Sequence, residues 1–320
     1  MMKSALRALV MAALAIGLAG PALAADVLHV GKAAQEASPL LPVDVGTKAG
    51  IFAKHGLDVQ FSNFSGGGKL HQAMEAGAID IGVGAGPELA LIAKGAQELA
   101  VANHFPPVTF IGIAVPADST ARTIDDLKGK KIGVSTAGSL TYWLALELAR
   151  KKNWGPDGIQ IVAIGNGSPS IVAGFRTHAV DADIAATSII FNMEADGVGR
   201  LLIPASQYEG NLGAGMVFVT KKLIADNPDA IRRFLAGLFD TIDYMRSHKD
   251  ETVKIESEAT GFPIGVQSKE YDLTIGSFSM TGKFDQESLD NLEHSFSDLK
   301  LLYTPPDIKT LYTEEFLPKR

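Results

Sequence analysis

The chain has 320 residues, of which 46% are hydrophobic and 20% are charged, so it is neither a disordered chain nor one with many membrane spans. Its length exceeds the usual size of a single hydrophobic core, which favours two domains. The formal net charge of −7 argues against nucleic acid as a partner, and the absence of cysteine excludes a disulfide framework, a lipid-modified cysteine and a thiolate metal site.

The first 24 residues match the pattern of a secretory signal peptide. Lys3 and Arg7 precede an apolar run over residues 8–19, and small residues at positions 21–24 supply a cleavage site before Ala25. A membrane anchor is the alternative, but glycines and a proline break the run before the roughly 20 residues that a span requires. Removal of this segment changes the formal charge from −7 to −9, because two positive charges leave with it. We expect a soluble periplasmic protein that is not anchored to a membrane.

Residues 27–61 predict two strands with helical turns between them. Residues 27–31 and 57–61 read as the strands, while Pro39 and Pro42 interrupt any earlier helix. Gly56 ends the helical segment, since glycine readily adopts the left-handed conformation at a helix C-terminus.

One stretch of sequence occurs twice without a gap, at residues 65–85 and again at residues 166–186. Each copy has a loop of small residues, a short amphipathic helix, a turn that carries Asp and a buried strand, and Asp80 aligns with Asp181. This order is one crossover unit of an α/β sheet. Both loops stand at a helix N-terminus, where unpaired backbone N–H groups can receive a ligand. The repeat therefore predicts two similar lobes that face one another across a ligand cleft.

Two further apolar segments, residues 108–115 and 216–220, are predicted to cross between the lobes. They assign residues 25–110 and 216–320 to lobe one, with the C-terminal helices, and residues 111–215 to lobe two. The other elements are expected as strands at residues 98–103, 131–134, 158–164 and 200–203 and as helices at 87–94, 123–127, 140–152, 187–195 and 230–246. The expected fold class is α/β, with a mixed sheet flanked by helices in each lobe.

Several motifs carry a family resemblance that covers nearly the whole mature chain. They are Gly50-Ile51-Phe52 with residues 56–59, Ser65-Gly66-Gly67, residues 76–82, residues 126–134 and residues 227–234. On these motifs the chain resembles the nitrate, taurine and aliphatic-sulfonate substrate-binding proteins of ABC transporters, whose superfamily includes proteins that bind thiamine-pyrimidine precursors. The resemblance implies the type II periplasmic binding protein fold, in which two α/β lobes joined by two crossing strands close on a ligand.

Small residues at helix N-termini are the first candidate ligand-binding residues. They offer backbone N–H groups and hydroxyls at the carboxyl ends of strands, where open α/β sheets bind ligands. Plain helix capping is the alternative role of such residues. The candidates are Ser65, Gly66 and Gly67 in lobe one, and Ser135, Gly138, Ser139, Thr141, Ser168, Pro169, Thr187 and Ser188 in lobe two.

Glu88, His104, Phe105 and Phe191 are the candidates with larger side chains. Glu88 follows a buried strand and is expected to place a carboxylate at the cleft, although a first-turn Glu can also serve only its own helix dipole. His104 and Phe105 precede the first crossing strand, where the histidine either donates to an oxyanion or is structural. Phe191 either offers an aromatic face or packs in the core.

The candidate cleft holds few cations. No arginine falls in its loops, and Lys32 and Lys69, the nearest cations, are expected at the solvated surface. A charged ligand would then depend on helix N-termini. Together with Glu88, this favours a polar neutral or zwitterionic molecule, or a small organic acid held by backbone amides, over a bare inorganic anion.

The expected function is that of a monomeric receptor of an ABC importer. It would capture a small polar organic molecule, such as a sulfonate, carboxylate or heterocycle, and deliver it to the permease and its ATPase subunits. The histidines show no metal-ligand spacing, and no nucleophile elbow or phosphate-binding loop is present, so no catalytic site, metal or cofactor is expected. Two alternatives stay open: an enzyme of the pyrimidine-precursor-synthase type, whose cysteine-rich motif this chain lacks, and the receptor of a TRAP-type transporter.

Overall fold

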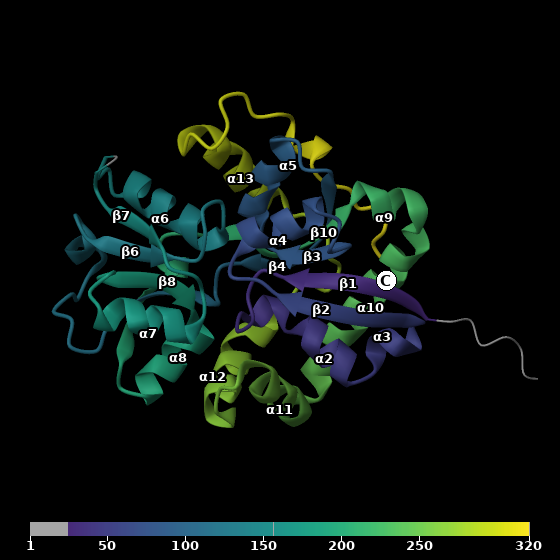
Figure 1. The fold of residues 1–320 in the computed structure, drawn as a ribbon, viewed down its shortest axis with the longest axis horizontal. Coiled ribbons are helices and arrows are strands. Elements are labelled where there is room, and N and C mark those ends of the chain that lie inside the picture. Colours follow the sequence, from purple (N-terminus) through teal and green to yellow (C-terminus); the bar gives the residue numbers. More distant parts are fainter. Residues whose placement is uncertain (1–24, 156, 320) are drawn as a thin grey trace, which may run out of the picture.

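Residues 25–155 and 157–319 are described by the computed structural model, and they form two five-stranded sheets flanked by helices (Figure 1). The predicted signal peptide, residues 1–24, lies outside the described residues. Both sheets contain parallel and antiparallel pairs, so the expected α/β class with two mixed sheets is confirmed.

The first sheet has the strand order β2-β1-β3-β10-β4. β1 pairs in parallel with β2 and β3, whereas β10 runs antiparallel to β3 and β4. Val30 in the middle of this parallel set is in register with Phe61 on one side and Ile81 on the other. The strands are β1 (Asp26–Lys32), β2 (Leu57–Asn63), β3 (Ile81–Gly84), β4 (Glu98–Pro107) and β10 (Asn211–Thr220).

The second sheet repeats this plan with the order β7-β6-β8-β5-β9. β6 pairs in parallel with β7 and β8, and β5 runs antiparallel to β8 and β9. The strands are β5 (Ile111–Pro116), β6 (Lys131–Val134), β7 (Gln160–Ala163), β8 (Ala182–Ala186) and β9 (Gly199–Pro204). In each sheet the three parallel strands end at the same edge, so the loops that follow them lie side by side.

The chain passes from the first sheet to the second over residues 108–110 and returns over residues 205–210. β10 begins at Asn211, earlier than the segment predicted from residue 216. The strand is longer than predicted because Gly213 and Gly215 are typical of a turn in the sequence. Gly213 has a φ of +60°, and the pairing with β4 shifts register between Asn211 and Met216, so these glycines form an irregular strand rather than a loop.

Helices cover both sheets. Beside the second sheet lie α6 (Leu140–Lys151), α7 (Ser168–Arg176), α8 (Thr187–Ala195) and the short turns η3 (Ile124–Leu127) and η4 (Ala205–Gln207). The first part of the chain adds η1 (Ser38–Leu40), α2 (Pro42–Lys48), α3 (Ile51–Lys54), α4 (Gly67–Glu75), η2 (Gly86–Glu88) and α5 (Leu89–Ala93). The C-terminal part adds α9 (Lys221–Asp226), α10 (Pro228–Ser247), α11 (Lys249–Thr260), α12 (Ile264–Thr274), η5 (Ile275–Ser277), α13 (Gln286–Asp298) and η6 (Ile308–Thr310).

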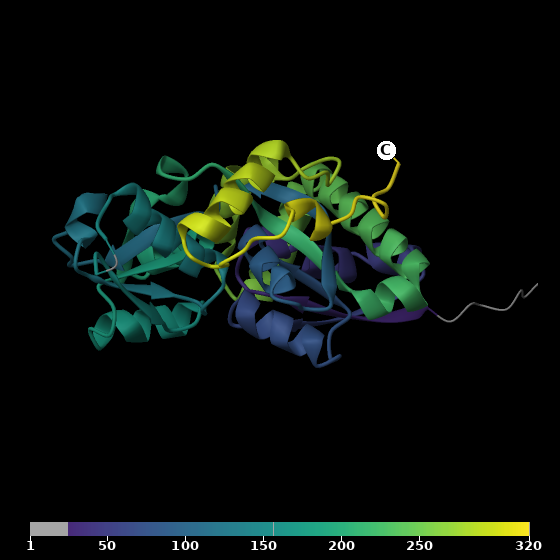
Figure 2. The same cartoon turned by 90° about the horizontal axis from the view of Figure 1, so that it is seen from above.

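The C-terminal helices pack on several parts of the molecule. α10 packs on α2 and α3, where the rings of Phe52 and Phe234 stack with centroids 5.2 Å apart. α13 packs on β10, and Figure 2 shows this last segment, in yellow, running across the middle of the molecule. α12 contacts both η1 and α8 and so touches elements that flank each sheet. In the described part of the chain, no helix is long and apolar enough to cross a membrane.

Candidate functional site

A cavity of about 70 Å³ lies between the two sheets. Its wall comes from the segments that follow the parallel strands β1, β2 and β3 on one side and β6, β7 and β8 on the other, which is where open α/β sheets bind ligands. Most of the wall is apolar. The lining residues are Ala33, Ala34, Ala37, Leu40, Gly66, Gly67, Gly84, Ala85, Glu88, Phe110, Ile111, Ser135, Ser139, Leu140, Thr141, Asn166, Ile184, Ala185, Ala186, Ile189 and Ala214.

Glu88 reaches this cavity while only 2% of its surface is exposed. It ends η2 and precedes α5, but its side chain makes no capping hydrogen bond to that helix. Two glycines leave room for the carboxylate, because a Cβ atom at Gly67 or Gly84 would overlap Glu88. At this point the cavity wall is the Glu88 carboxylate, which packs between the backbone of Gly67 and the backbone of Gly84.

His71 holds Glu88 in place from behind the wall. Its Nε2 lies 2.9 Å from Glu88 Oε2, and its Nδ1 lies 2.6 Å from Glu98 Oε2. Burial disfavours the imidazolium, but the hydrogen bonds and charges of both carboxylates outweigh it and raise the pKa of His71 to about 9. We call these three residues the Glu–His–Glu chain. At neutral pH its centre is a cation with a carboxylate on each side.

The second-sheet side of the cavity carries a cluster of hydroxyls after β6. Ser135 Oγ donates to Ser139 Oγ at 2.8 Å, and the backbone N–H of Ser135 donates to Thr141 Oγ1 at 2.9 Å. Ser139 also caps α6, because its Oγ accepts from the backbone N–H of Tyr142. Capping and cavity lining thus coincide in one residue. Gly138 has a φ of +77° and shapes the same loop without lining the cavity.

Both copies of the repeat contribute to the cavity and to a separate outer groove. Gly66 and Gly67 line the cavity, whereas Ser65, Ser168 and Pro169 line an outer groove of about 1100 Å³. Asn166 lines both, and its Nδ2 donates to the backbone oxygen of Ala33 at 3.0 Å, which joins the second-sheet side to the first. We did not single out Asn166 from the sequence, although it begins the second copy of the repeat.

Besides Ser65, Gly138, Ser168 and Pro169, five further predicted site residues do not line the cavity, because their polar atoms or rings make other contacts. His104 donates through Nε2 to the backbone oxygen of Pro39 at 2.7 Å, and Phe105 meets Phe110 and Phe278 edge to face. The Thr187 hydroxyl bonds to the backbone oxygen of Phe110 and to the Glu270 carboxylate. Ser188 donates to the backbone oxygen of Glu36. The Phe191 ring lies under the Lys269 ammonium. Their roles in ligand binding stay predictions.

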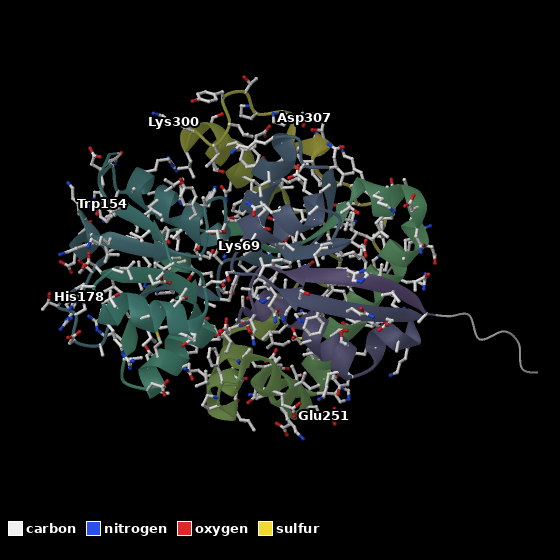
Figure 3. The ribbon with its side chains drawn as sticks, viewed as in Figure 1. Lys69, Trp154, His178, Glu251, Lys300 and Asp307 are labelled. Carbon is white, nitrogen blue, oxygen red and sulfur yellow. The ribbon has the colours of Figure 1, made fainter. Side chains whose placement is uncertain are left out.

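Lys32 does not lie at the solvated surface as expected. It is fully buried, its ammonium pairs with the Asp44 carboxylate, and it lies 5.2 Å from the centre of the Phe61 ring. Burial lowers the pKa of Lys32, although Asp44 partly offsets this effect. Lys69 lines a separate hollow, near the middle of the molecule in Figure 3. No lysine, arginine or histidine is among the described residues that line the cavity.

Glu270 of α12 connects the two sides of the molecule beside the cavity. Its carboxylate accepts hydrogen bonds from Ser38 of η1 and, at 2.7 Å, from Thr187 at the start of α8. Burial raises the pKa of Glu270 to about 7, although the two hydroxyl donors partly offset it. Glu270 therefore links segments that flank the two sheets, in addition to the hydrogen bonds from Asn166 to Ala33 and from Ser188 to Glu36.

Among residues 25–155 and 157–319, no group of three or more His, Asp or Glu side chains is arranged to hold a metal ion. The cavity wall instead offers one carboxylate, three hydroxyls, one side-chain amide and a largely hydrocarbon surface. Such a wall suits the reversible binding of a small organic molecule.

Comparison with known proteins places the chain among similar sequences and folds. A family model described as NMT1/THI5 like matches residues 40–252. A relative from Brucella abortus, provisionally named a binding protein, is 27% identical over 221 residues, which cover 67% of this chain and 66% of the relative. The chain thus spans just under two thirds of that relative's length.

Solved structures share the fold at low sequence identity. The alkanesulfonate-binding protein SsuA from Xanthomonas axonopodis pv. citri, bound to MOPS, has a TM-score of 0.73 and 20% identity, covering 88% of this chain and 95% of that one. The desulfurization enzyme DszB has a TM-score of 0.61 and 16% identity, covering 91% of this chain and 97% of the enzyme. The same architecture therefore carries both binding proteins and an enzyme.

Proposed function

This chain belongs to the NMT1/THI5-like family, and from that membership we propose that it is a periplasmic solute-binding receptor of an ABC importer. It captures a small organic molecule between lobe one, residues 25–110 and 216–320, and lobe two, residues 111–215. The observation that carries the proposal is the cavity, whose wall is drawn from the carboxyl ends of parallel strands in both sheets.

The mechanism is closure of the two lobes on the ligand. A ligand that touches Gly66 and Glu88 on one side and Ser135 and Asn166 on the other gains contacts only when the lobes are together. That difference in binding free energy shifts the population towards the closed form. The bond between Asn166 and Ala33 and the close approach of Gly66 to Ser135 support a closed arrangement, because both join segments of different sheets.

The partners that follow from this function are a permease and its ATPase subunits. The closed receptor would dock on the permease and release the ligand on opening. The signal-peptide pattern of residues 1–24 supports a periplasmic location, because export precedes capture outside the inner membrane. We propose a receptor rather than an enzyme, since within the described residues the wall hydroxyls Ser135 and Ser139 bond to one another and the one histidine beside Glu88 lies behind the wall.

Native mass spectrometry of the mature protein, combined with small-angle X-ray scattering, tests this function. The protein purified from its own host is expected to carry a small molecule. Its removal should increase the radius of gyration, and its return should reverse the change. An Asn166→Ala variant should bind the same molecule more weakly, by about tenfold, because it loses a contact that only the closed form makes. A protein whose scattering and thermal stability respond to no small molecule would contradict the proposal.

A further inference from the structure

The charge of the cavity wall restricts the ligand. Glu88 is the only ionisable side chain among the described residues that line the cavity. The neighbouring wall is alanine, isoleucine, leucine and phenylalanine, with hydroxyls after β6 on the opposite side. A ligand in this space therefore meets one carboxylate and no cation.

Glu88 has unused hydrogen-bonding capacity towards the cavity. Oε2 is occupied by His71, whereas Oε1 has no hydrogen-bond partner among the described residues. Oε1 lies against Gly67, a lining residue, where a side chain would overlap it. A carboxylate this deeply buried is stabilised by further donors, so the free oxygen is a ready acceptor for an N–H group.

The groups behind Glu88 leave a negative charge at the wall. In the Glu–His–Glu chain, the single positive charge of His71 is shared between Glu88 and Glu98, and both carboxylates are as buried as the ring between them. Glu98 Oε1 also lacks a partner in the described structure. The three residues together carry an excess of one negative charge, and the low dielectric of their surroundings strengthens its attraction for a cation.

We propose that the ligand of this cavity presents a protonated amine or an amidinium to Glu88 Oε1, with its apolar carbon against the neighbouring alanine, isoleucine, leucine and phenylalanine side chains. The inference rests on the proposed receptor function and names its ligand class. A sulfonate carries acceptor oxygens only, so against Glu88 it would place like charges together without a donor between them. Because of this carboxylate, the proposed ligand class differs from that of the similar alkanesulfonate-binding protein.

The size of the cavity sets how much of the ligand is enclosed. Its volume is about 70 Å³, which leaves room for a small group only. The closed structure therefore encloses a small N–H-bearing group, and a larger body requires the lobes to part further. Short amines and amidines are the probes that match this geometry.

Thermal unfolding and calorimetric titration of the mature protein, freed of bound ligand, test the ligand class with matched pairs of probes. The pairs are n-butylammonium with 1-butanesulfonate and benzamidinium with benzenesulfonate. We expect both cations to raise the unfolding temperature saturably and neither sulfonate to do so. Stronger binding of the sulfonates would overturn the ligand class while it supports the receptor function. A response to none of the four, together with no co-purified molecule, would contradict the receptor function itself.

Two variants separate the wall charge from net charge. Glu88→Gln is expected to weaken benzamidinium binding by at least about tenfold, because the amide keeps the shape but loses the negative charge. Glu147→Gln is the matched control, since Glu147 is equally buried, pairs with Arg150 on α6 and does not line the cavity. Its affinity should stay within about twofold. Equal losses in both variants would overturn the role of Glu88, and the comparison of probes on the unaltered protein stands even if a variant fails to fold.

Discussion

Asp80 and Asp181 make the same pair of hydrogen bonds on the two sides of the molecule. Asp80 Oδ2 accepts from the backbone N–H of His29 at 3.0 Å, while its own N–H donates to the His29 oxygen at 2.8 Å. Asp181 does the same with Lys131, with both distances 2.8 Å. Each aspartate thus ties the turn before one strand to the parallel neighbour of that strand, at His29 in the middle of β1 and at Lys131 at the start of β6, which is why this repeated turn requires an Asp.

Replacing either aspartate should destabilise the fold without touching the cavity. Asp80→Ala and Asp181→Ala are each expected to lower the free energy of unfolding by about 1 kcal/mol, since each removes one side-chain hydrogen bond to a backbone N–H. The two sites lie on different sheets, so the double variant should show the sum of the two changes. Urea unfolding measures all three. A double variant no less stable than either single one would contradict this equivalence.

The Glu–His–Glu chain should make the fold less stable at alkaline pH. The pKa of His71 is raised from its ordinary 6.5 to about 9, so its contribution is complete below pH 6.5 and is lost as pH rises through 9. Burial likewise raises the pKa of Glu256 to about 8 and of Glu270 to about 7. The ionisation of these two carboxyl groups therefore also lowers the free energy of unfolding as pH rises. The His71 part amounts to about 3 kcal/mol.

Urea unfolding between pH 6 and pH 9.5 checks this loss. His71→Gln should flatten the upper part of the profile, because the amide does not titrate. His55→Gln is the control, since His55 lies partly exposed beside Asp240 and away from the cavity. A wild-type profile that rises over this range would show that the imidazole between Glu88 and Glu98 is not held as a cation.

His104 should make the fold less stable at acid pH. Burial lowers the pKa of His104 to about 4, although the hydrogen bond to the Pro39 oxygen partly offsets it. Its contribution is present above pH 6.5 and is lost as pH falls through 4, by about 3 kcal/mol in all. His104→Gln keeps a donor for Pro39 and should reduce the acid loss in urea unfolding. An unchanged acid profile in this variant would assign the loss to other groups.

Gly67 should be essential for binding rather than for folding. In Gly67→Ala the new methyl would overlap Glu88 and push the carboxylate off its site, so binding of benzamidinium should weaken by at least about tenfold, while overpacking costs about 1–3 kcal/mol of stability. Gly265→Ala is the matched control on α12, where a Cβ meets no atom within 4 Å. Calorimetric titration distinguishes them, and equal affinities in both would contradict the arrangement at Gly67.

Local patterns located some of the residues that line the cavity, although their role in ligand binding stays a prediction. The repeat and the strand ends located Gly66, Gly67 and Glu88 on one side and Ser135 and Ser139 on the other, because the loop that follows a parallel strand is a short-range feature. Gly77 and His178 occupy matching turn positions with φ values of +74° and +54°, so even the less favourable residue follows the repeated backbone.

The groups that surround the wall could not be predicted in this way. His71 lies on the buried side of α4, where a histidine reads as an ordinary core residue, and Glu98 opens a strand several elements later. Glu270 is separated from Ser38 by 232 residues. Each pairing depends on how elements that are far apart in the sequence pack together, and a single sequence does not show which elements meet. Lys32 was placed in solvent for the same reason, because its partner Asp44 belongs to another element.

The contact between Glu270 and Thr187 should affect the closure of the lobes more than the stability of either lobe. Thr187→Val removes a buried hydroxyl that bridges α8 to α12, so it should weaken the closed form by about 1 kcal/mol and reduce benzamidinium affinity about fivefold. Thr241→Val is the matched control, because Thr241 is equally buried but donates only to Gly237 of its own helix. That variant should lose unfolding free energy and keep its affinity. Small-angle scattering should show a larger radius of gyration for Thr187→Val alone, since only this variant weakens the contact between α8 and α12.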